Sequence, residues 1–150
     1  MKKVLFICTG NTCRSPMAQA IFNSICAEKG LDMHAESVGL AAAMGQSASD
    51  NAVKVMAEKG IDISSHRSRF LPSLNLNEFT YFVLMNESGV PILNSMGIPD
   101  EYIRVLKRKP SDNIYDLDTG ISDPFGGDIT VYRKCRDELY YAVSELIKTL

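Results

Sequence analysis

The stretch VLFICTGNTCRSPMAQAIF, residues 4 to 22, runs from an apolar segment through a short polar loop into helix-forming sequence. Residues 3 to 7 show no alternation of polar and apolar side chains, which is typical of a strand covered on both faces in a parallel sheet. Pro16 fits the first turn of the following helix, and Lys29-Gly30 is a common signal for a helix end. The stretch therefore predicts a central strand, a loop and a helix.

The rest of the chain alternates between the two kinds of element. We expect strands at 33–38, 81–85 and around 102–106, and helices at 51–59, near 87–96 and from about 129 to 150. Alternating strands and helices imply right-handed crossovers around a parallel sheet, so the predicted fold class is doubly wound α/β. Residues 107–127 have the composition of a loop, and a loop of this length is usually functional.

The composition limits the kinds of partner. A chain of 150 residues with 45% hydrophobic content should form a single domain, residues 1–150. Sixteen basic and eighteen acidic side chains nearly cancel, which argues against nucleic acid or an anionic membrane as partner. Neither a signal peptide nor an apolar span of about 20 residues is apparent, so we expect a cytoplasmic protein. Its cysteines should then be thiols, and Cys26 and Cys135 fall in helical patterns that suit buried core thiols.

The loop between the first strand and the first helix has the features of an anion site. In a doubly wound sheet, ligands bind beyond the carboxyl ends of the strands where the strand order reverses, and Cys8 lies at such an end. Five residues separate Cys8 from Arg14 in a Cys-X5-Arg motif. Gly10 and Asn11 tolerate the positive φ angles that let successive N–H groups converge on one anion, and the helix N-terminus adds positive charge.

The same loop combines a nucleophile with a phosphate clamp. The planar guanidinium of Arg14 can hold two oxygens of a phosphate as they become equatorial in the transition state. Next to these positive groups Cys8 should be a thiolate at neutral pH, and the Ser15 hydroxyl can donate to its sulfur. A thiolate below a phosphate indicates attack on phosphorus. The predicted phosphate-binding loop comprises Thr9, Gly10, Asn11, Thr12, Cys13 and Ser15.

A displaced leaving group needs a proton, and the resulting phosphocysteine needs a base that activates water. Asp123 is the candidate for both roles because Pro124 fixes the backbone after it, and Phe125 follows as a wall for a substrate slot. The alternative is an ordinary Asp-Pro turn. Asp128 is interpreted as the N-cap of the last helix.

Two other interpretations of the cysteine loop remain open. Cys8 and Cys13 could ligate a metal, but their spacing is not a common zinc pattern, and His34 and His66 are the only histidines. We therefore predict neither metal nor cofactor. The loop could also bind phosphate without chemistry, although it lacks a Walker-type lysine and the cysteine would then have no purpose.

With these residues assembled, the sequence resembles the low-molecular-weight protein-tyrosine-phosphatase family along nearly its entire length. The resemblance rests on the motif from Cys8 to Ser15 together with Asp123-Pro124. It implies a flavodoxin-like, four-stranded parallel sheet with helices on both faces, and a metal-free mechanism through S-phosphocysteine. It also implies bracing of the phosphate loop by Asn11, Ser37 and His66, contact of Ser15 with the nucleophile, and a protective disulfide between Cys13 and the oxidised nucleophile.

Departures from the family pattern bear on the substrate. Members that cleave phosphotyrosine typically have an aliphatic residue in place of Thr12 and two aromatic residues in place of Phe125-Gly126. They often have an aromatic residue in the segment that is here residues 40–44. Thr12 and Phe125 thus resemble the bacterial branch that acts on protein arginine. Both substrates stay open, with a slight preference for phosphoarginine, and we expect a monomer acting on phosphorylated proteins.

Two further functions compete with this one. Thiol-dependent arsenate reductases share the fold and the loop, but they need additional cysteines after the third strand, and residues 81–101 contain none. A non-catalytic phosphoprotein-binding module on a degenerate scaffold would not need Cys8, Arg14 and Asp123 intact.

Overall fold

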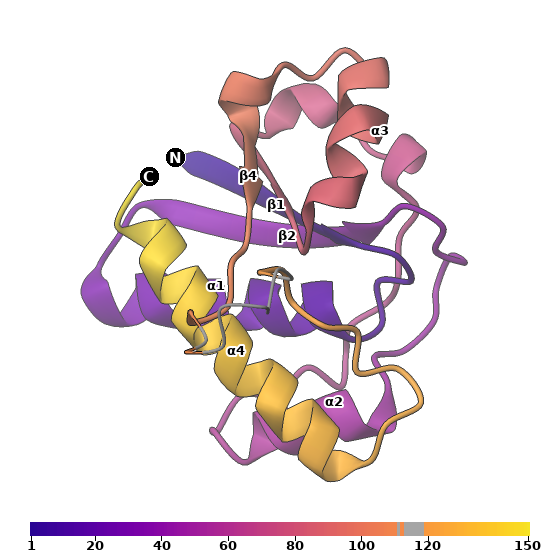
Figure 1. Cartoon of the computed structure of the whole chain (residues 1–150), viewed down its shortest axis with the longest axis vertical. Coiled ribbons are helices and arrows are strands. Elements are labelled where there is room, and N and C mark those ends of the chain that lie inside the picture. The colour runs from indigo at the N-terminus through magenta and orange to yellow at the C-terminus, as the bar shows by residue number, and fades with distance from the viewer. Residues whose placement is uncertain (111, 113–118) are drawn as a thin grey trace.

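A four-stranded parallel sheet with the order β2-β1-β3-β4 forms the centre of the molecule (Figure 1). The computed structural model describes residues 1–110, 112 and 119–150. The strands are β1 (Lys2–Cys8), β2 (Met33–Gly39), β3 (Tyr81–Leu84) and β4 (Ile103–Val105). The predicted parallel α/β fold is therefore confirmed, with β1 in the interior of the sheet.

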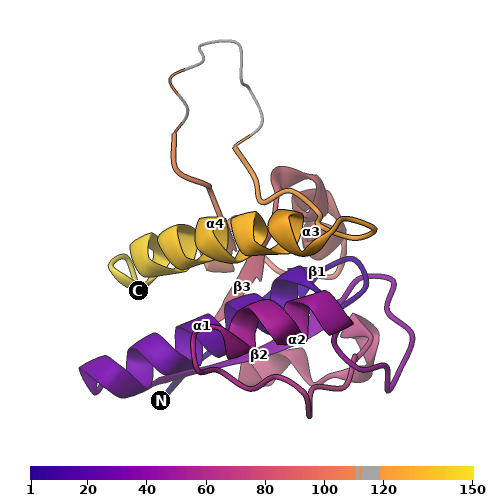
Figure 2. The same cartoon turned by 90° about the horizontal axis from the view of Figure 1, so that it is seen from below.

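Helices cover both faces of this sheet. They are α1 (Arg14–Lys29), α2 (Asp50–Ala57), α3 (Val90–Ser95) and α4 (Ile129–Ile147). Figures 1 and 2 show α1, α2 and α4 together on one side, with α3 on the other. Within the part of the chain that the structure describes, no helix is long and apolar enough to cross a membrane.

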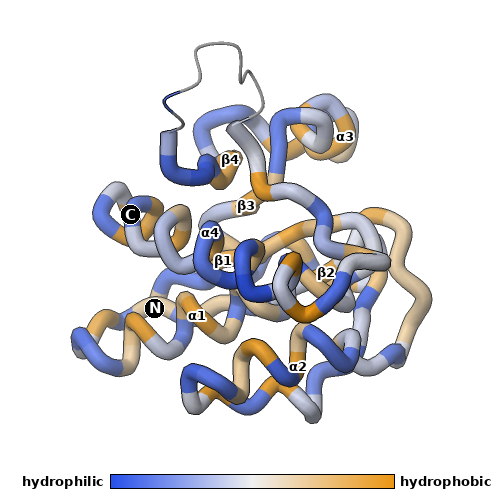
Figure 3. The backbone as a smooth tube through the Cα atoms, turned by 60° about the horizontal axis from the view of Figure 1, so that its bottom comes forward, coloured by the Kyte–Doolittle hydropathy of each residue, from blue (hydrophilic) through white to orange (hydrophobic). Residues whose placement is uncertain are grey.

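The side chains of β1 belong to two separate apolar clusters, one on each face of the sheet. Val4 and Phe6 belong to the cluster that packs against α1 and α4, whereas Leu5 and Ile7 belong to the cluster that includes Leu93 of α3. All four β1 side chains are at most 1% exposed, and burial of a side chain of this size contributes about 1.5–3 kcal/mol. Because both faces of β1 are buried, polar and apolar side chains do not alternate along this strand. Helix α2, by contrast, alternates between hydrophobic and hydrophilic residues along its length (Figure 3).

Most predicted element ends agree with the structure. Helix α1 ends at Gly30, whose φ of 65° is the left-handed conformation expected of a terminal glycine. Asp128 caps α4 by accepting from the Val131 N–H at 3.1 Å, as predicted. The predicted helix 51–59 spans Asp50–Ala57 instead, and the predicted helix 129–150 ends at Ile147. Of the predicted loop 107–127, residues 111 and 113–118 lie outside the described residues.

An ion-pair cluster joins the end of α2 to α4. The Glu58 carboxylate accepts hydrogen bonds from Arg133 and Arg136, each at 2.7 Å. These hydrogen bonds lower the pKa of Glu58 to about 2, and those from Arg133 have the largest effect. Arg136 also donates to the Val55 carbonyl at 2.9 Å. Because the loop before α4 carries Asp123, this cluster helps to fix the helix that anchors that loop.

Candidate active site

The phosphate-loop sequence lies at the point where the strand order reverses. Strand β1 pairs with β2 on one side and with β3 on the other. Cys8 is the last residue of β1, and α1 begins at Arg14. The loop between them therefore occupies the place where doubly wound sheets bind ligands.

Two hydrogen-bond donors surround the Cys8 sulfur. The Ser15 hydroxyl lies 2.8 Å from Cys8 Sγ, and the Asn11 N–H donates to the same sulfur at 3.2 Å. Cys8 is only 6% exposed, so its sulfur sits at the base of a cavity with donors behind it. Donors in this position stabilise a thiolate more than a thiol.

Asn11 is the centre of the network that holds the loop. It adopts a φ of 57°, which asparagine tolerates better than most residues. Its amide nitrogen donates to the hydroxyls of Ser15 and Ser37 at 2.8 and 3.0 Å. Its amide oxygen accepts from the Arg69 N–H at 2.9 Å, and its main-chain oxygen lies 2.7 Å from Nε2 of His66. The structure thus brings together Asn11, Ser37 and His66, the residues that the family resemblance implies as braces of the loop.

The tautomer of His66 follows from its partner. A carbonyl oxygen can only accept, so Nε2 must carry the hydrogen that bonds Asn11. Burial lowers the pKa of His66. The hydrogen bond to Asn11 raises this pKa, whereas the positive charges of Arg69 and Arg67 lower it further. His66 is therefore favoured as a neutral donor.

Sequence reasoning missed two members of this network. Gln19 of α1 accepts from the Ser37 hydroxyl at 2.6 Å, and Arg69 supplies the main-chain N–H to Asn11. Among the described residues, no buried side-chain nitrogen or oxygen lacks a partner. No local motif marks Gln19 or Arg69, because each reaches the loop only through the tertiary fold.

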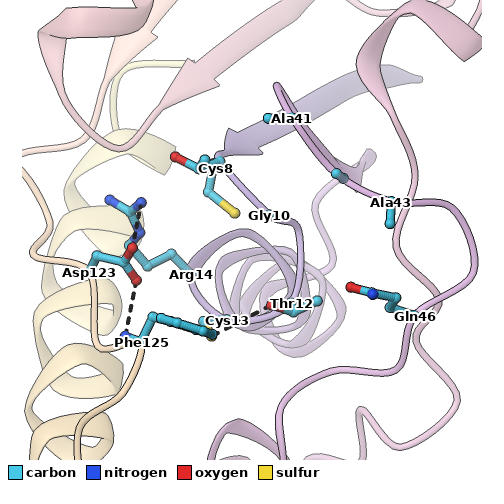
Figure 4. Close-up of a pocket in the computed structure, with 12 residues that line it drawn as sticks. Cys8, Gly10, Thr12, Cys13, Arg14, Ala41, Ala43, Gln46, Asp123 and Phe125 are labelled. Carbon is cyan, nitrogen blue, oxygen red and sulfur yellow. Dashed lines mark hydrogen bonds and ion pairs between the residues drawn. The ribbon is translucent and has the colours of Figure 1, made fainter.

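Arg14 and Asp123 face one another across the site (Figure 4). Arg14 is buried and donates to the Ile121 carbonyl at 3.1 Å, while its other terminal nitrogen lies 3.7 Å from Asp123 Oδ2. The Asp123 side chain is 53% exposed. Its Oδ1 accepts from the Phe125 N–H at 3.1 Å, so the Asp-Pro turn of the alternative interpretation exists, and the same carboxylate also faces Arg14.

A cavity of about 370 Å³ connects these groups. Its lining residues are Cys8, Thr9, Gly10, Thr12, Cys13, Arg14, Ala41, Ala42, Ala43, Gln46, Asp123 and Phe125. Phe125 is the only aromatic residue among them, and it is 78% exposed. Gln46 follows the segment 40–44, and no local signal in the sequence marks it as a residue of the cavity wall.

Cys13 points into a different environment from Cys8. Its sulfur lies 3.3 Å from the Tyr132 hydroxyl and 3.5 Å from Ser49 Oγ. Burial, followed by the bond to Cys13, raises the pKa of Tyr132 to about 12. Cys26 and Cys135 are buried core thiols as predicted, and burial raises the pKa of Cys135 to about 12.

Comparison with known proteins assigns the chain to one family. The model of the low molecular weight phosphotyrosine protein phosphatase family matches residues 3–150. A protein-arginine-phosphatase of Bacillus subtilis is 33% identical over 98% of this chain and 95% of its own length. A second protein-arginine-phosphatase, from Geobacillus stearothermophilus, is 36% identical over 99% of this chain and 95% of its own length. The chain belongs to the low molecular weight phosphotyrosine protein phosphatase family.

Solved structures agree with this assignment. A low molecular weight protein tyrosine phosphatase from T. tengcongensis superposes with a TM-score of 0.88 at 37% identity and covers 100% of both chains. The arginine phosphatase YwlE, in a cysteine-to-serine variant with a phosphorylated active-site serine, gives a TM-score of 0.85 at 32% identity, covering 99% of this chain and 95% of that one. A phosphoryl group on the residue that replaces cysteine is consistent with a phosphocysteine-type mechanism. The protein is therefore an enzyme of the protein phosphatase class.

Proposed function

We propose that this chain removes phosphoryl groups from arginine side chains of proteins, with Cys8 as nucleophile, Arg14 as phosphate clamp and Asp123 as acid and base. The observation that carries the proposal is the Cys8 sulfur, 2.8 Å from Ser15 Oγ at the base of a cavity that Arg14 and Asp123 line. This cavity combines a nucleophile, a buried arginine and a carboxyl group.

The first step transfers the phosphoryl group to the enzyme. The Cys8 thiolate attacks phosphorus while the bond from phosphorus to the leaving nitrogen breaks, and that nitrogen takes the proton of the Asp123 carboxylic acid. The guanidinium of Arg14 and the N–H groups of the loop hold the phosphoryl oxygens as they become equatorial. The products of this step are S-phosphocysteine, the arginine side chain as its guanidinium and the Asp123 carboxylate.

The second step restores the enzyme. The Asp123 carboxylate takes a proton from water, and the water oxygen attacks the phosphorus of phosphocysteine. The sulfur–phosphorus bond breaks, its electron pair returns to Cys8 as a thiolate, and inorganic phosphate leaves. The exposure of Asp123 supports this role, because water must reach the carboxylate after the leaving group has departed.

The cavity walls favour a guanidinium over a phenyl ring. A phenyl ring prefers flat apolar walls on both sides, but the cavity has the Thr12 hydroxyl, three alanines and a single exposed aromatic residue, Phe125. Two relatives that match nearly the whole chain are named protein-arginine-phosphatase. Phosphotyrosine remains the second candidate, since Phe125 offers one such wall.

The test is kcat/KM on matched phosphoarginine and phosphotyrosine peptides, for the wild type and for Thr12→Ile. The wild type should prefer phosphoarginine, and Thr12→Ile should reverse that preference. Thr80→Ile, a control outside the cavity, should leave the preference unchanged. A wild-type preference for phosphotyrosine that Thr12→Ile does not alter would contradict the proposal and identify the enzyme as a tyrosine phosphatase.

We also propose that Cys13 protects the nucleophile from oxidation. Peroxide would convert the Cys8 thiolate to a sulfenic acid, which the Cys13 thiol attacks to form a disulfide and release water. Such a disulfide would replace the present contacts of Cys13 with Tyr132 and Ser49. Cys13→Ser should stay active but lose recovery by reductant after peroxide treatment, and unchanged recovery would contradict this role.

Finally, we propose that residues 1–150 act as one domain and as a monomer in the cytoplasm. The family match over residues 3–150 supports the single domain, and four free thiols suit a reducing compartment. Light scattering coupled to gel filtration should give one species near the chain mass of 16.6 kDa. A species of twice that mass would contradict the monomer.

A further inference from the structure

Gln46 presents an amide at the mouth of the cavity, opposite the proposed acid. Four lining residues carry a side-chain oxygen, namely Thr9, Thr12, Gln46 and Asp123. In Figure 4 the amide end of Gln46 points toward Thr12, on the far side of the cavity from Asp123. A leaving group held above the phosphate loop would therefore lie between the Asp123 carboxyl group and the Gln46 amide.

The backbone holds Gln46 in this place. Its N–H donates to the Ser68 hydroxyl at 2.9 Å, and its carbonyl accepts from the Ser68 N–H at 2.7 Å. The Gly45 N–H donates to the Ser68 carbonyl at 2.8 Å, and Ser68 itself is buried. Three residues further along, the Ser49 N–H donates to the Thr12 carbonyl at 2.9 Å. This segment is thus tied to the phosphate loop, which fixes the distance from Gln46 to the reacting group.

The amide itself is available to a ligand. Among the described residues, none makes a hydrogen bond with the Gln46 side chain, although its backbone is fully bonded. Asn11, which also carries an amide near the site, uses both amide atoms within the loop network. Gln46 therefore supplies the unbonded amide of the cavity wall.

The two candidate leaving groups, a guanidinium and a phenol, differ in the number of hydrogen-bond acceptors that they need from the cavity wall. A guanidinium carries N–H donors on all three nitrogens, and each donor that enters the cavity loses water and needs an acceptor. A phenol ring carries no such donors along its edge. Asp123 faces the nitrogen that takes the proton, so the remaining donors need an acceptor on the opposite side. The amide oxygen of Gln46 can accept there.

We propose that Gln46 is a specificity-determining residue whose amide oxygen accepts a hydrogen bond from the guanidinium of phosphoarginine. This inference rests on the proposed function and names a contact that the phosphotyrosine substrate cannot make. The expected signature is a change in the ratio of kcat/KM for phosphoarginine to kcat/KM for phosphotyrosine, because a general disturbance of the loop would affect both substrates alike.

The experiment compares Gln46→Met and Gln46→Glu with a control. Gln46→Met keeps the length of the side chain but removes the acceptor, and should lower kcat/KM for phosphoarginine peptides about tenfold while phosphotyrosine peptides change less than about twofold. Gln46→Glu retains an acceptor and should keep or raise the ratio. Ser47→Glu places the same charge on a neighbour outside the cavity lining, and should leave the ratio unchanged.

The outcomes separate this inference from the proposed function. Equal loss on both substrates in Gln46→Met, or an unchanged ratio, would overturn the role of Gln46 while the wild-type preference for phosphoarginine stands. A wild type without activity on phosphoarginine would overturn the proposed function and this inference together, before any variant is measured. Thermal unfolding of each variant shows whether a loss reflects the fold instead of the contact.

Discussion

The two halves of the site are built in opposite ways. In the half that would hold the phosphoryl group, the side chains that brace the loop are buried and hydrogen-bonded, with Asn11, Ser15 and Ser37 at 0% exposure. The half that would hold the leaving group is open. There Asp123 has a side chain 53% exposed and a single 3.7 Å contact to Arg14, and Phe125 is 78% exposed.

This difference matches what the two halves must recognise. The phosphoryl group is the same in every substrate, so a rigid loop serves all of them, and preorganised donors avoid reorganisation during the reaction. The leaving group differs between substrates, and an open wall can change without disturbing the loop. Changes to the buried side chains that brace the loop should therefore affect all substrates equally, whereas changes to the side chains that line the open wall, Thr12 included, should depend on the leaving group.

The largest effect should follow from Cys8→Ser. A hydroxyl in this position is a far weaker nucleophile than a thiolate, so turnover should fall about 10,000-fold or more on every substrate. Steady-state hydrolysis of an aryl phosphate and of a phosphoarginine peptide checks this. Cys26→Ser, at a buried thiol of α1 away from the cavity, is the matched control and should keep its activity.

Asp123→Asn should have the next largest effect, and it should vary with the leaving group. Loss of general acid catalysis in the first step should lower kcat/KM about 100-fold to about 10,000-fold for poor leaving groups, and much less for a good one such as nitrophenolate. Asp128→Asn is the control, because asparagine caps helices as well as aspartate does. An equal loss on all substrates would contradict the role of Asp123 as acid.

Asn11→Gly should lower kcat about tenfold to about 100-fold, by the same factor on good and poor leaving groups. Glycine adopts the φ of 57° without strain, so the variant isolates the loss of the amide bonds to Ser15, Ser37 and Arg69. Ser37→Ala removes one of these bonds and should have a smaller effect. A dependence of either loss on the leaving group would break the division between the two halves.

The smallest expected effect concerns pH and His66. Because burial holds the pKa of His66 below its ordinary value of 6.5, the unfolded chain binds this proton more readily. The stability contribution of neutral His66 is thus fully present above about pH 6.5 and decreases as the pH falls toward the folded-state pKa. Urea unfolding across this range should show a weaker pH dependence in His66→Gln than in the wild type, whereas His34→Gln should behave like the wild type.

The sequence predicted the elements whose signals are local. The unbroken apolar run of residues 3–7 predicted an interior strand, and Gly30 and Asp128 marked helix ends correctly. Helix α2 ends two residues before its predicted end at 59, because its last turn tightens: the Gly60 N–H bonds the Ala57 carbonyl three residues back. No propensity distinguishes such a turn from a further turn of helix.

Site residues in the contiguous motif were similarly predictable, and those brought in by the fold were not. The structure gathers Cys8, Arg14 and Asp123 around one cavity as the sequence suggested. Arg69 joins through its main-chain N–H, which any residue type except proline could supply, so this contact leaves no signal in the sequence. Gln46 lies on an exposed loop where a polar residue is ordinary, and only the position of that loop beside Thr12 makes it notable.

The most direct test of the central claim is to trap the phosphoenzyme. The Asp123→Asn variant, mixed with excess nitrophenyl phosphate and quenched, should accumulate S-phosphocysteine, because this good leaving group departs without the acid whereas the second step lacks its base. Mass spectrometry of the digested protein should then place one phosphoryl group on the peptide that contains Cys8. A quenched enzyme that turns over substrate yet carries no phosphoryl group, or carries it on another residue, would contradict the account.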